Sequence, residues 1–423
     1  MKRVLVVLVV MFVVLSSLVW AGGKKESPAP AKTTTTTTEE KKPEPAKSGV
    51  VVNEWEIPFL NVLTGPIASI GAYLQWGAEQ AAREINAAGG IAGKPVKIGK
   101  IDTGMSPETG SVEMGKIVKT ALVAMGPVPE TVIMASMPIA VENQFMSMTA
   151  TTSYEYAVKF FPWSISWFPP TEERLATVIT GWVEEVGLKG KSAVQFIENY
   201  GPWPGMAKAH SLGLTKGGAR ELNNIDVPQD AVTFGPLVVK ALEQKPDALI
   251  FACNAEKVAK IIIELKNRGW KNMNNILVFN SADDVPLYAT GQANLAGVML
   301  YNYTDPNLNT PRWTRYREAY KAAFTGGDPP PLSTHYYDAV YMIKDAIEKT
   351  GVTGDPARLK EERAKIRDYC YNAQNFQGIQ FTWNMKEGVP TNKPLFLIEL
   401  KEDQSAPNKV VKTVRKVVVP KGE

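Results

Sequence analysis

Residue patterns typical of enzymes are sparse in this sequence of 423 residues. It has no H-E-x-x-H metal motif, no G-x-S-x-G nucleophile turn and no C-x-x-C pair, and its two histidines, His210 and His335, lie far apart. Residues 88–95, AGGIAGKP, come near a phosphate loop but carry Pro95 where a metal-binding hydroxyl is needed. We therefore expect no catalytic residue, no metal site and no cofactor, and we expect both histidines to be packing or surface residues.

One segment does carry binding chemistry, at the expected start of a helix. Residues 63–98, LTGPIASIGAYLQWGAEQAAREINAAGGIAGKPVKI, predict a strand end, a tight turn, an amphipathic helix, a glycine stop and a new strand. Ser69 can cap this helix, and Gly89 with Gly90 can end it in a left-handed turn. Its apolar side chains at helical spacing are Leu74, Ala78, Ala81, Ala82 and Ile85. The free N–H groups at such a helix start suit an anionic or carbonyl oxygen.

The elements that must position this turn alternate between short apolar strands and helical patterns. Strands are expected at residues 55–60, 96–102, 121–125, 145–148, 192–197, 248–252 and 276–279, with helices such as 107–119, 131–141 and 255–268 following them. This alternation of strands and helices predicts an α/β fold of doubly wound parallel sheets with helices on both faces. Ligands collect at the carboxyl ends of such strands, so we expect site residues in the loops that follow them.

The amino-terminal segment predicts export. Lys2 and Arg3 precede an apolar run at residues 4–20, so we expect residues 1–21 to form a signal peptide that is cleaved after Ala21. An uncleaved anchor is the alternative. Residues 22–50 are rich in Lys, Glu, Pro and Ala and contain six threonines at 33–38, which predicts a low-complexity linker. This linker is either an inert spacer, a stalk or a glycosylated segment.

Charge and cysteine content limit the partners. Residues 1–50 hold eight basic and four acidic side chains, which account for the whole formal charge of +4, so the remaining chain is balanced. A neutral globular part predicts small-molecule and protein partners and no nucleic acid. Cys253 and Cys370 could form one disulfide in an oxidising compartment, although we expect them to remain apart because Cys253 ends an apolar strand and Cys370 lies in a charged helical stretch.

Five motifs in order resemble one known family. They are the LTGP turn with Ser-x-Gly, EIN and GGIAGKPV, then FIENYGPWPG at 196–205, PDALIF at 246–251, LAGVMLY at 295–301 and YYDAVYMIKDAIEKTG at 336–351. Together they resemble the periplasmic binding proteins for branched-chain amino acids and their relatives. The resemblance implies the type I fold, in which two doubly wound lobes are joined by a three-crossover hinge, here near Phe168, Tyr301 and Gly378. The first lobe would comprise 51–168 plus 302–378, and the second 169–301 plus 379–423.

The resemblance also implies ligand-binding residues in the first lobe. Ser69 and Ile70 occupy the helix-start turn, and Ile70 stands where the family often has an aromatic residue. Glu130 stands about where a serine hydroxyl usually holds a ligand carboxylate, and two carboxylates side by side repel each other. Either Thr131 takes the hydroxyl role, or the ligand presents a donor or cation to Glu130, or Glu130 faces solvent.

The other implied site residues lie in four further loops. Thr149, Ala150 and Thr151 resemble the family's Ala-Thr loop, with Thr151 either holding the ligand or capping a turn. Second-lobe residues carried over in the same way are Tyr200, Asn254 and Asp283. Asn254 could instead cap a helix, and Asp283 with Asp284 could simply form a turn.

Together these features predict a monomeric extracytoplasmic solute-binding protein rather than an enzyme. Its two lobes would close on an amino acid or a related small polar compound, such as an amide or a urea-like or aromatic molecule, and deliver it to the membrane permease of an ABC transporter. A ligand-sensing module for a membrane receptor and an exported enzyme are the alternatives.

Overall fold

The computed structural model describes residues 52–65, 67–151, 153–166, 171–199, 201–279, 283–324 and 327–418. The predicted signal peptide and almost all of the predicted linker fall in a separate unit, Met1–Ser48, and both lie outside the described residues, as do Tyr200 and the crossover at Phe168. Everything described below belongs to the compact unit Gly49–Glu423. Within the described ranges, no helix combines the length and apolar character needed to cross a membrane.

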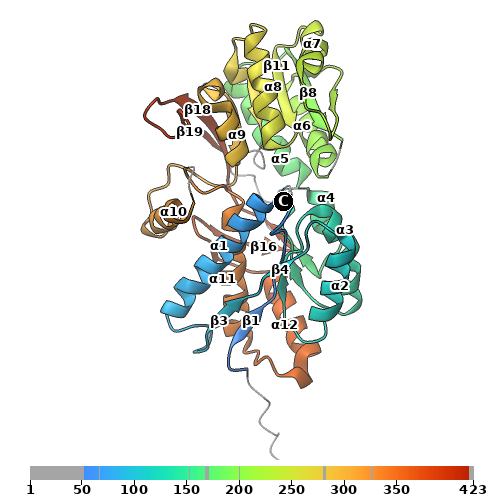
Figure 1. The fold of residues 1–423 in the computed structure, drawn as a ribbon, viewed down its shortest axis with the longest axis vertical. Coiled ribbons are helices and arrows are strands. Elements are labelled where there is room, and N and C mark those ends of the chain that lie inside the picture. Colours follow the sequence, from blue (N-terminus) through green and yellow to red (C-terminus); the bar gives the residue numbers. More distant parts are fainter. Residues whose placement is uncertain are drawn as a thin grey trace, which may run out of the picture. The chain divides into compact units, whose positions relative to one another are not determined.

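The first lobe is built from short parallel strands (Figure 1). β1 (Trp55–Ile57) pairs with β3 (Val96–Ile98), and β2 (Leu60–Asn61) pairs with β4 (Ile101–Asp102). β5 (Ala124–Met125), β6 (Ser147–Met148) and β7 (Ser164–Ile165) form a three-stranded parallel sheet. Its helices are α1 (Ala68–Ala87), α2 (Pro107–Ile117), α3 (Glu130–Glu142), α4 (Tyr154–Val158), α10 (Pro311–Ala323), α11 (Ser333–Thr350) and α12 (Leu359–Tyr371).

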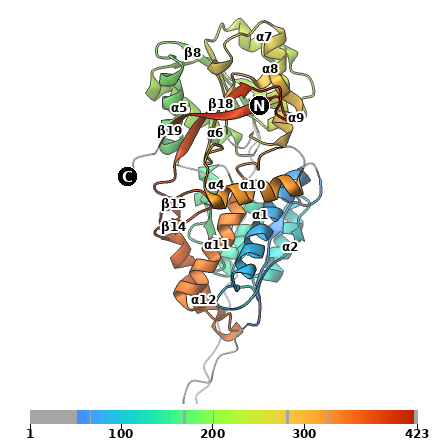
Figure 2. The ribbon, with the colours of Figure 1, turned by 90° about the vertical axis from the view of Figure 1, so that its left-hand side faces the viewer.

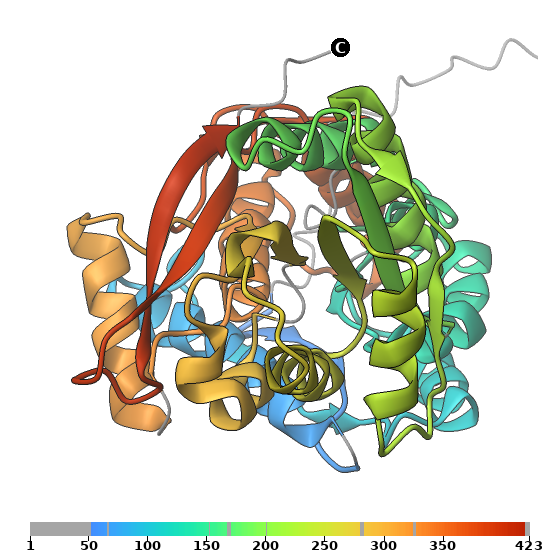
Figure 3. The ribbon, with the colours of Figure 1, turned by 90° about the horizontal axis from the view of Figure 1, so that it is seen from above.

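The second lobe has one larger sheet, in the order β10-β8-β11-β12-β13-β18-β19, with β9 beside β8. Its parallel strands are β8 (Ser192–Glu198), β9 (Arg220–Glu221), β10 (Ile225–Val227), β11 (Ala248–Ala252), β12 (Ile276–Val278) and β13 (Met299–Asn302). The antiparallel hairpin of β18 (Leu395–Glu402) and β19 (Val410–Val418) completes one edge (Figure 3). The helices are α5 (Glu172–Glu185), α6 (Trp203–Gly217), α7 (Gly235–Glu243), α8 (Ala255–Asn267) and α9 (Val285–Gly291).

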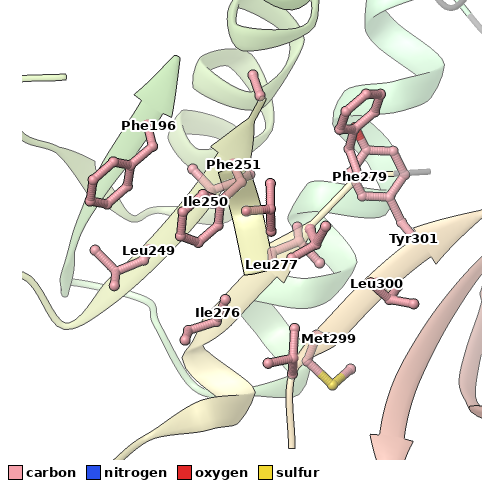
Figure 4. Packing of buried hydrophobic residues seen from close by; sticks show 14 of the residues in the cluster. Phe196, Leu249, Ile250, Phe251, Ile276, Leu277, Phe279, Met299, Leu300 and Tyr301 are labelled. Atoms are coloured by element: carbon pink, nitrogen blue, oxygen red, sulfur yellow. The ribbon is translucent and has the colours of Figure 1, made fainter. Parts of the chain in front are cut away.

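Two separate hydrophobic cores underlie the two lobes. The core of the second lobe takes side chains from between Leu175 and Tyr303 and from the β18–β19 hairpin, and in it Phe196 stacks on Phe251 with ring centroids 5.0 Å apart (Figure 4). The main first-lobe core includes four apolar side chains that share one face of α11, namely Ala339, Met342, Ile343 and Ile347. The α/β architecture of two doubly wound parallel lobes is therefore confirmed.

The predicted lobe boundaries stay predictions, but the cores add detail at the third crossover. Trp383 and Met385 lie beyond Gly378 and still pack in the first-lobe core. They belong to two small hairpins, β14 (Phe376–Gln377) with β15 (Thr382–Trp383) and β16 (Met385–Lys386) with β17 (Val389–Pro390). Short 3-10 helices occur at Met273–Asn275, Gln292–Leu295 and Pro356–Arg358.

Helix α1 packs very closely onto the first-lobe strands. A Cβ atom at Gly71 would lie 1.6 Å from the carbonyl oxygen of Val62, which no real structure tolerates. The buried Asn61 fixes the same junction, because its Nδ2 donates to the Gly71 carbonyl at 2.8 Å and its Oδ1 accepts from the Val62 amide at 2.8 Å. The start of α1 is therefore held at the carboxyl end of β2.

Candidate functional site

The loop that enters α1 is held by Asp102 at the end of β4. One carboxylate oxygen accepts from the amides of Leu63 and Gly104 at 2.8 and 2.9 Å, and the other accepts from the Thr64 hydroxyl at 2.6 Å. Burial alone would raise the pKa of Asp102, but these hydrogen bonds outweigh it and hold the pKa below its ordinary value. Asp102 therefore fixes the loop at the edge where we expect a ligand. The sequence motifs did not identify this residue.

The expected role of Ser69 as a helix cap is wrong. α1 begins at Ala68, its N-cap is Ile67, and no side chain caps it, because the helix begins two residues earlier than a cap at Ser69 would place it. The amides of Ile70 and Gly71 both donate to the Ile67 carbonyl, so these two N–H groups are not free for an anion. Ser69 is exposed and Ile70 is half-buried in this first turn.

Glu130 and Thr151 meet at the carboxyl edge of the first-lobe sheet. Glu130 is the first residue of α3, after β5, and Thr151 follows β6. The Thr151 hydroxyl donates to the Glu130 carboxylate at 3.1 Å and accepts from the Ser153 amide at 3.2 Å. Thr151 therefore forms the turn that the sequence offered as one alternative, and it also orients the glutamate. Thr131 lies half-buried in the same first turn of α3.

Thr149 and Ala150 form the buried floor beside this pair. The Thr149 hydroxyl is 3.0 Å from the Ser164 hydroxyl, and its carbonyl accepts from Nε2 of His335 at 2.8 Å. Burial lowers the pKa of His335 to about 3, so the imidazole is neutral and carries its proton on Nε2. His335 and the equally buried His210 are packing residues, as expected.

In the second lobe Asn254 is part of a polar cluster at the ends of β8 and β11. It caps α8, because its Oδ1 accepts from the Lys257 amide at 3.1 Å, and its Nδ2 donates to Glu198 at 3.1 Å. Glu198 also forms a buried ion pair with Lys257, with Nζ 2.6 Å from the carboxylate. The helix-cap alternative for Asn254 is the arrangement found, and Glu198 and Lys257 are site-edge residues that the sequence reading missed.

The two neighbouring acids before α9 have different surroundings. Asp283 is almost fully buried and is held by the second lobe itself, through Tyr288 and Asn302 at 2.5 Å each and Lys412 at 2.6 Å. Asp284 caps α9 and also accepts from the hydroxyl of Tyr73 at 3.4 Å. Because Tyr73 belongs to α1 of the first lobe, Asp284 is the acid that reaches across to the other lobe.

Burial, and to a smaller extent neighbouring Asp283, raises the pKa of Asp284, whereas the Val285 amide, Tyr73 and Lys412 lower it, and the net pKa is about 6. Asp284 is therefore partly protonated near neutral pH. Tyr200, the remaining predicted contact, lies outside the described residues.

Other reactive side chains are enclosed. Cys253 and Cys370 are free, buried and placed in different cores, and burial raises the pKa of both thiols. Among the described residues, no group of three or more His, Cys, Asp or Glu side chains is arranged to hold a metal ion. What the described edge offers is hydrogen-bonding groups, chiefly carboxylates and hydroxyls, at the carboxyl ends of strands in both lobes.

Comparison with known proteins gives a consistent set of relatives. Residues 54–405 match the periplasmic binding protein family. The chain is 25% identical over 299 residues to the Leu/Ile/Val-binding protein homolog 3 of Brucella melitensis biotype 1, an alignment that covers 70% of this chain and 79% of that protein.

Two solved structures illustrate the likeness in fold. A leucine-binding protein from Thermotoga maritima has a TM-score of 0.72 at 20% identity, with 87% of this chain and 99% of that chain covered. A solute-binding protein of an ABC transporter from Rhodopseudomonas palustris BisB5, in complex with 3,4-dihydroxybenzoic acid, has a TM-score of 0.72 at 16% identity, with 87% and 98% covered.

Proposed function

Because this chain belongs to the periplasmic binding protein family, we propose that it binds a small polar organic molecule between its two lobes and delivers it to the membrane permease of an ABC transporter. The proposed location is extracytoplasmic, which agrees with the family and with the predicted signal peptide. The relatives support this function through their descriptions as amino-acid-binding and ABC-transporter solute-binding proteins.

We assign the first-lobe contacts to Glu130, Thr131, Thr151 and the turn at Ser69 and Ile70, above the floor of Thr149 and Ala150. The observation that carries the assignment is the Glu130 carboxylate, oriented by the Thr151 hydroxyl at 3.1 Å where a parallel sheet ends. An ionised carboxylate only accepts hydrogen bonds, so Glu130 suits a ligand group that donates and offers no donor to an anion.

The negative charge of Glu130 limits which chemical groups of a ligand can lie beside it. Two like charges 4 Å apart repel each other by about 4 kcal/mol at the effective dielectric constant of a protein surface, which corresponds to roughly a thousandfold in affinity. A ligand carboxylate beside Glu130 is therefore disfavoured, whereas an amine, amide or hydroxyl group that donates to Glu130 is favoured. We propose a ligand that places such a donor, and not a carboxylate, at this end of the site.

On the second lobe we propose that Asp284, with Tyr200 and Asn254, completes the binding surface. Asp283 is the weaker candidate because Tyr288, Asn302 and Lys412 already occupy its oxygens. The Tyr73–Asp284 contact gives the two lobes a direct link that a bound ligand can reinforce. Ligand contacts from both sides shift the hinge equilibrium toward closure, because a ligand that binds the closed state better increases its population.

A thermal-shift screen of the purified chain tests this proposal. The panel contains three compounds with branched aliphatic bodies and different head groups, namely isoleucine, isovaleramide and isoamylamine, and one aromatic compound with two hydroxyl groups, 3,4-dihydroxybenzoate. A ligand present at a hundred times its Kd stabilises the folded state by about 2.7 kcal/mol. We expect a shift with the amide, the amine or the dihydroxy compound and a weaker response to isoleucine. A preference for isoleucine that is unchanged in Glu130→Gln would contradict the proposed ligand class.

A further inference from the structure

A second cavity, apart from the Glu130 edge, is lined by residues of α10 and of the β18–β19 hairpin. Figure 2 shows where these two elements lie in the fold. Its volume is about 580 Å³, which is within the range of small-molecule sites. One wall contains Arg317, Lys321 and Phe324 from α10 and the residue that follows it, and the other contains Val410 and Lys412 from β19. The proposed transport function makes no use of this cavity.

The charged side chains that line the cavity, together with Asp283, which pairs with Lys412, carry one excess positive charge. Asp328 accepts from Arg317 Nη2 and from Lys321 Nζ through the same carboxylate oxygen, at 2.8 Å each, so one acid faces two cations. Lys412 is neutralised separately by Asp283, at 2.6 Å. The three cations and two carboxylates therefore sum to one positive charge, which a single monoanion would balance.

A small inner cavity adjoins the larger one and shares Pro306, Arg317, Asp328 and Lys412 with it. Trp313 lines this inner space, and its side chain is 98% buried within the protein, at 2% exposure. Its indole N–H has no hydrogen-bond acceptor. The inner cavity, at about 10 Å³, has room for about one water-sized group, and because an indole only donates, that group must be an acceptor such as a single oxygen atom.

The rest of the larger cavity is mixed. Its apolar part is supplied by Phe324, Val410, Val411, Pro407 and the ring of Tyr288, and its polar part includes Asn307 and Asn408. Val411 is also one of the exposed large hydrophobic residues of the chain, at 39% exposure. A ligand that fits both the charged part and the apolar part of the cavity therefore combines one negative head group with a hydrocarbon body.

From these contacts we propose that this cavity is a second binding site, for a small amphipathic organic monoanion. Its carboxylate is held by Arg317 and Lys321 and accepts from the Trp313 indole, while its apolar body packs on Phe324 and Val410. The walls belong to different cores, since Trp313 and Phe324 pack with the first-lobe core and Tyr288 and Val410 with the second. A ligand bound here contacts both lobes and thereby couples to their relative movement.

The test uses hexanoate as the probe, in isothermal titration calorimetry on the purified chain. Hexanamide is the neutral partner with the same hydrocarbon body. We expect hexanoate to bind, and hexanamide to bind at least about tenfold more weakly because it lacks the charge. Arg317→Gln and Lys321→Gln should each weaken hexanoate binding about tenfold or more. Lys260→Gln, an exposed lysine of α8 that forms its own ion pair, is the matched control and should leave hexanoate binding unchanged.

Three outcomes would overturn the proposal. One is the absence of hexanoate binding at millimolar concentration, and another is equal binding of hexanoate and hexanamide. The third is hexanoate binding that persists in both α10 variants but strengthens in Glu130→Gln, because that pattern would place the anion at the first-lobe edge. These results are independent of the head-group screen that tests the transport function, so the two proposals can fail separately.

Discussion

The Thr151 hydroxyl donates to the Glu130 carboxylate across 3.1 Å and joins the loop after β6 to the start of α3, which follows the neighbouring strand β5. This bond fixes the direction of an acidic side chain at the edge where parallel α/β sheets bind ligands. We propose that it decides which end of a small molecule the first lobe accepts.

Glu130→Gln should lower the affinity for the amine or amide ligand by about ten- to a hundredfold, because a charge-assisted hydrogen bond becomes a neutral one. Thr151→Val, which keeps the shape but removes the hydroxyl, should have a smaller effect in the same direction. Calorimetric titration of each variant measures the change. Glu108→Gln is the control, since Glu108 is an exposed acid in the first turn of α2. Equal affinities in Glu130→Gln and in the control would remove Glu130 from the site.

The contact between α1 and β2 predicts a large stability effect at Gly71. Gly71→Ala must move the helix away from the Val62 carbonyl, which we expect to cost about 1–3 kcal/mol or more. The matched control is Gly115→Ala within α2, where nothing lies within 4 Å of the new methyl group. This second change should stabilise the protein by about 0.5–1 kcal/mol, because alanine favours the helix. Urea unfolding compares the two, and equal effects would show that the close approach is not required.

How far the sequence predicts the site can be judged at three places. The sequence was sufficient to predict the buried face and the end of α1. All five predicted side chains are buried, and Gly89 and Gly90 have positive φ. The role of Ser69 was wrong because a serine pattern cannot show that the backbone turn starts at Ile67. A local capping pattern does not determine the conformation of the neighbouring backbone.

Contacts between residues distant in the sequence were beyond the reach of pattern reading. Glu198 and Lys257 are 59 residues apart, and no periodicity marks them as partners. Asp283 and Asp284 are adjacent in one loop, so their types could not reveal that one is enclosed by the second lobe and the other faces Tyr73. The family resemblance identified the loop as part of the candidate site. The different roles of the two acids became visible only from their contacts in the fold.

The buried Glu198–Lys257 pair predicts an asymmetric mutational response. Lys257→Met leaves the carboxylate buried beside Asn254 without its cation, and we expect it to lose about 3–5 kcal/mol of unfolding free energy. Adding Glu198→Leu to that variant should recover part of the loss, because no uncompensated charge remains. Lys260→Met on the same helix is the exposed control and should change stability by less than about 0.5 kcal/mol. A double variant less stable than Lys257→Met would argue against the charge explanation.

The raised pKa of Asp284 predicts how the unfolding free energy depends on pH. Its pKa is raised to about 6 in the folded chain, from an ordinary value of 3.8. Between these values the folded chain retains a proton that the unfolded chain has released, so this group's contribution to the unfolding free energy falls as pH rises from about 4 to 6. Asp284→Asn keeps a capping side chain and cannot titrate.

Relative to the native chain, this variant should gain about 1–3 kcal/mol of stability between pH 4 and pH 7. Urea denaturation at several pH values measures that gain. A difference between the two proteins that does not change with pH would show that Asp284 titrates normally.

Peptide-level hydrogen exchange, with and without the ligand that gives the strongest thermal shift, tests most directly whether the ligand binds between the lobes. We predict that the ligand slows exchange together in the first-lobe loops at residues 126–131 and 149–153 and in the second-lobe segment 283–288. Slower exchange in one lobe alone, or confined to the walls of the second cavity, would contradict closure of the two lobes around a ligand at Glu130.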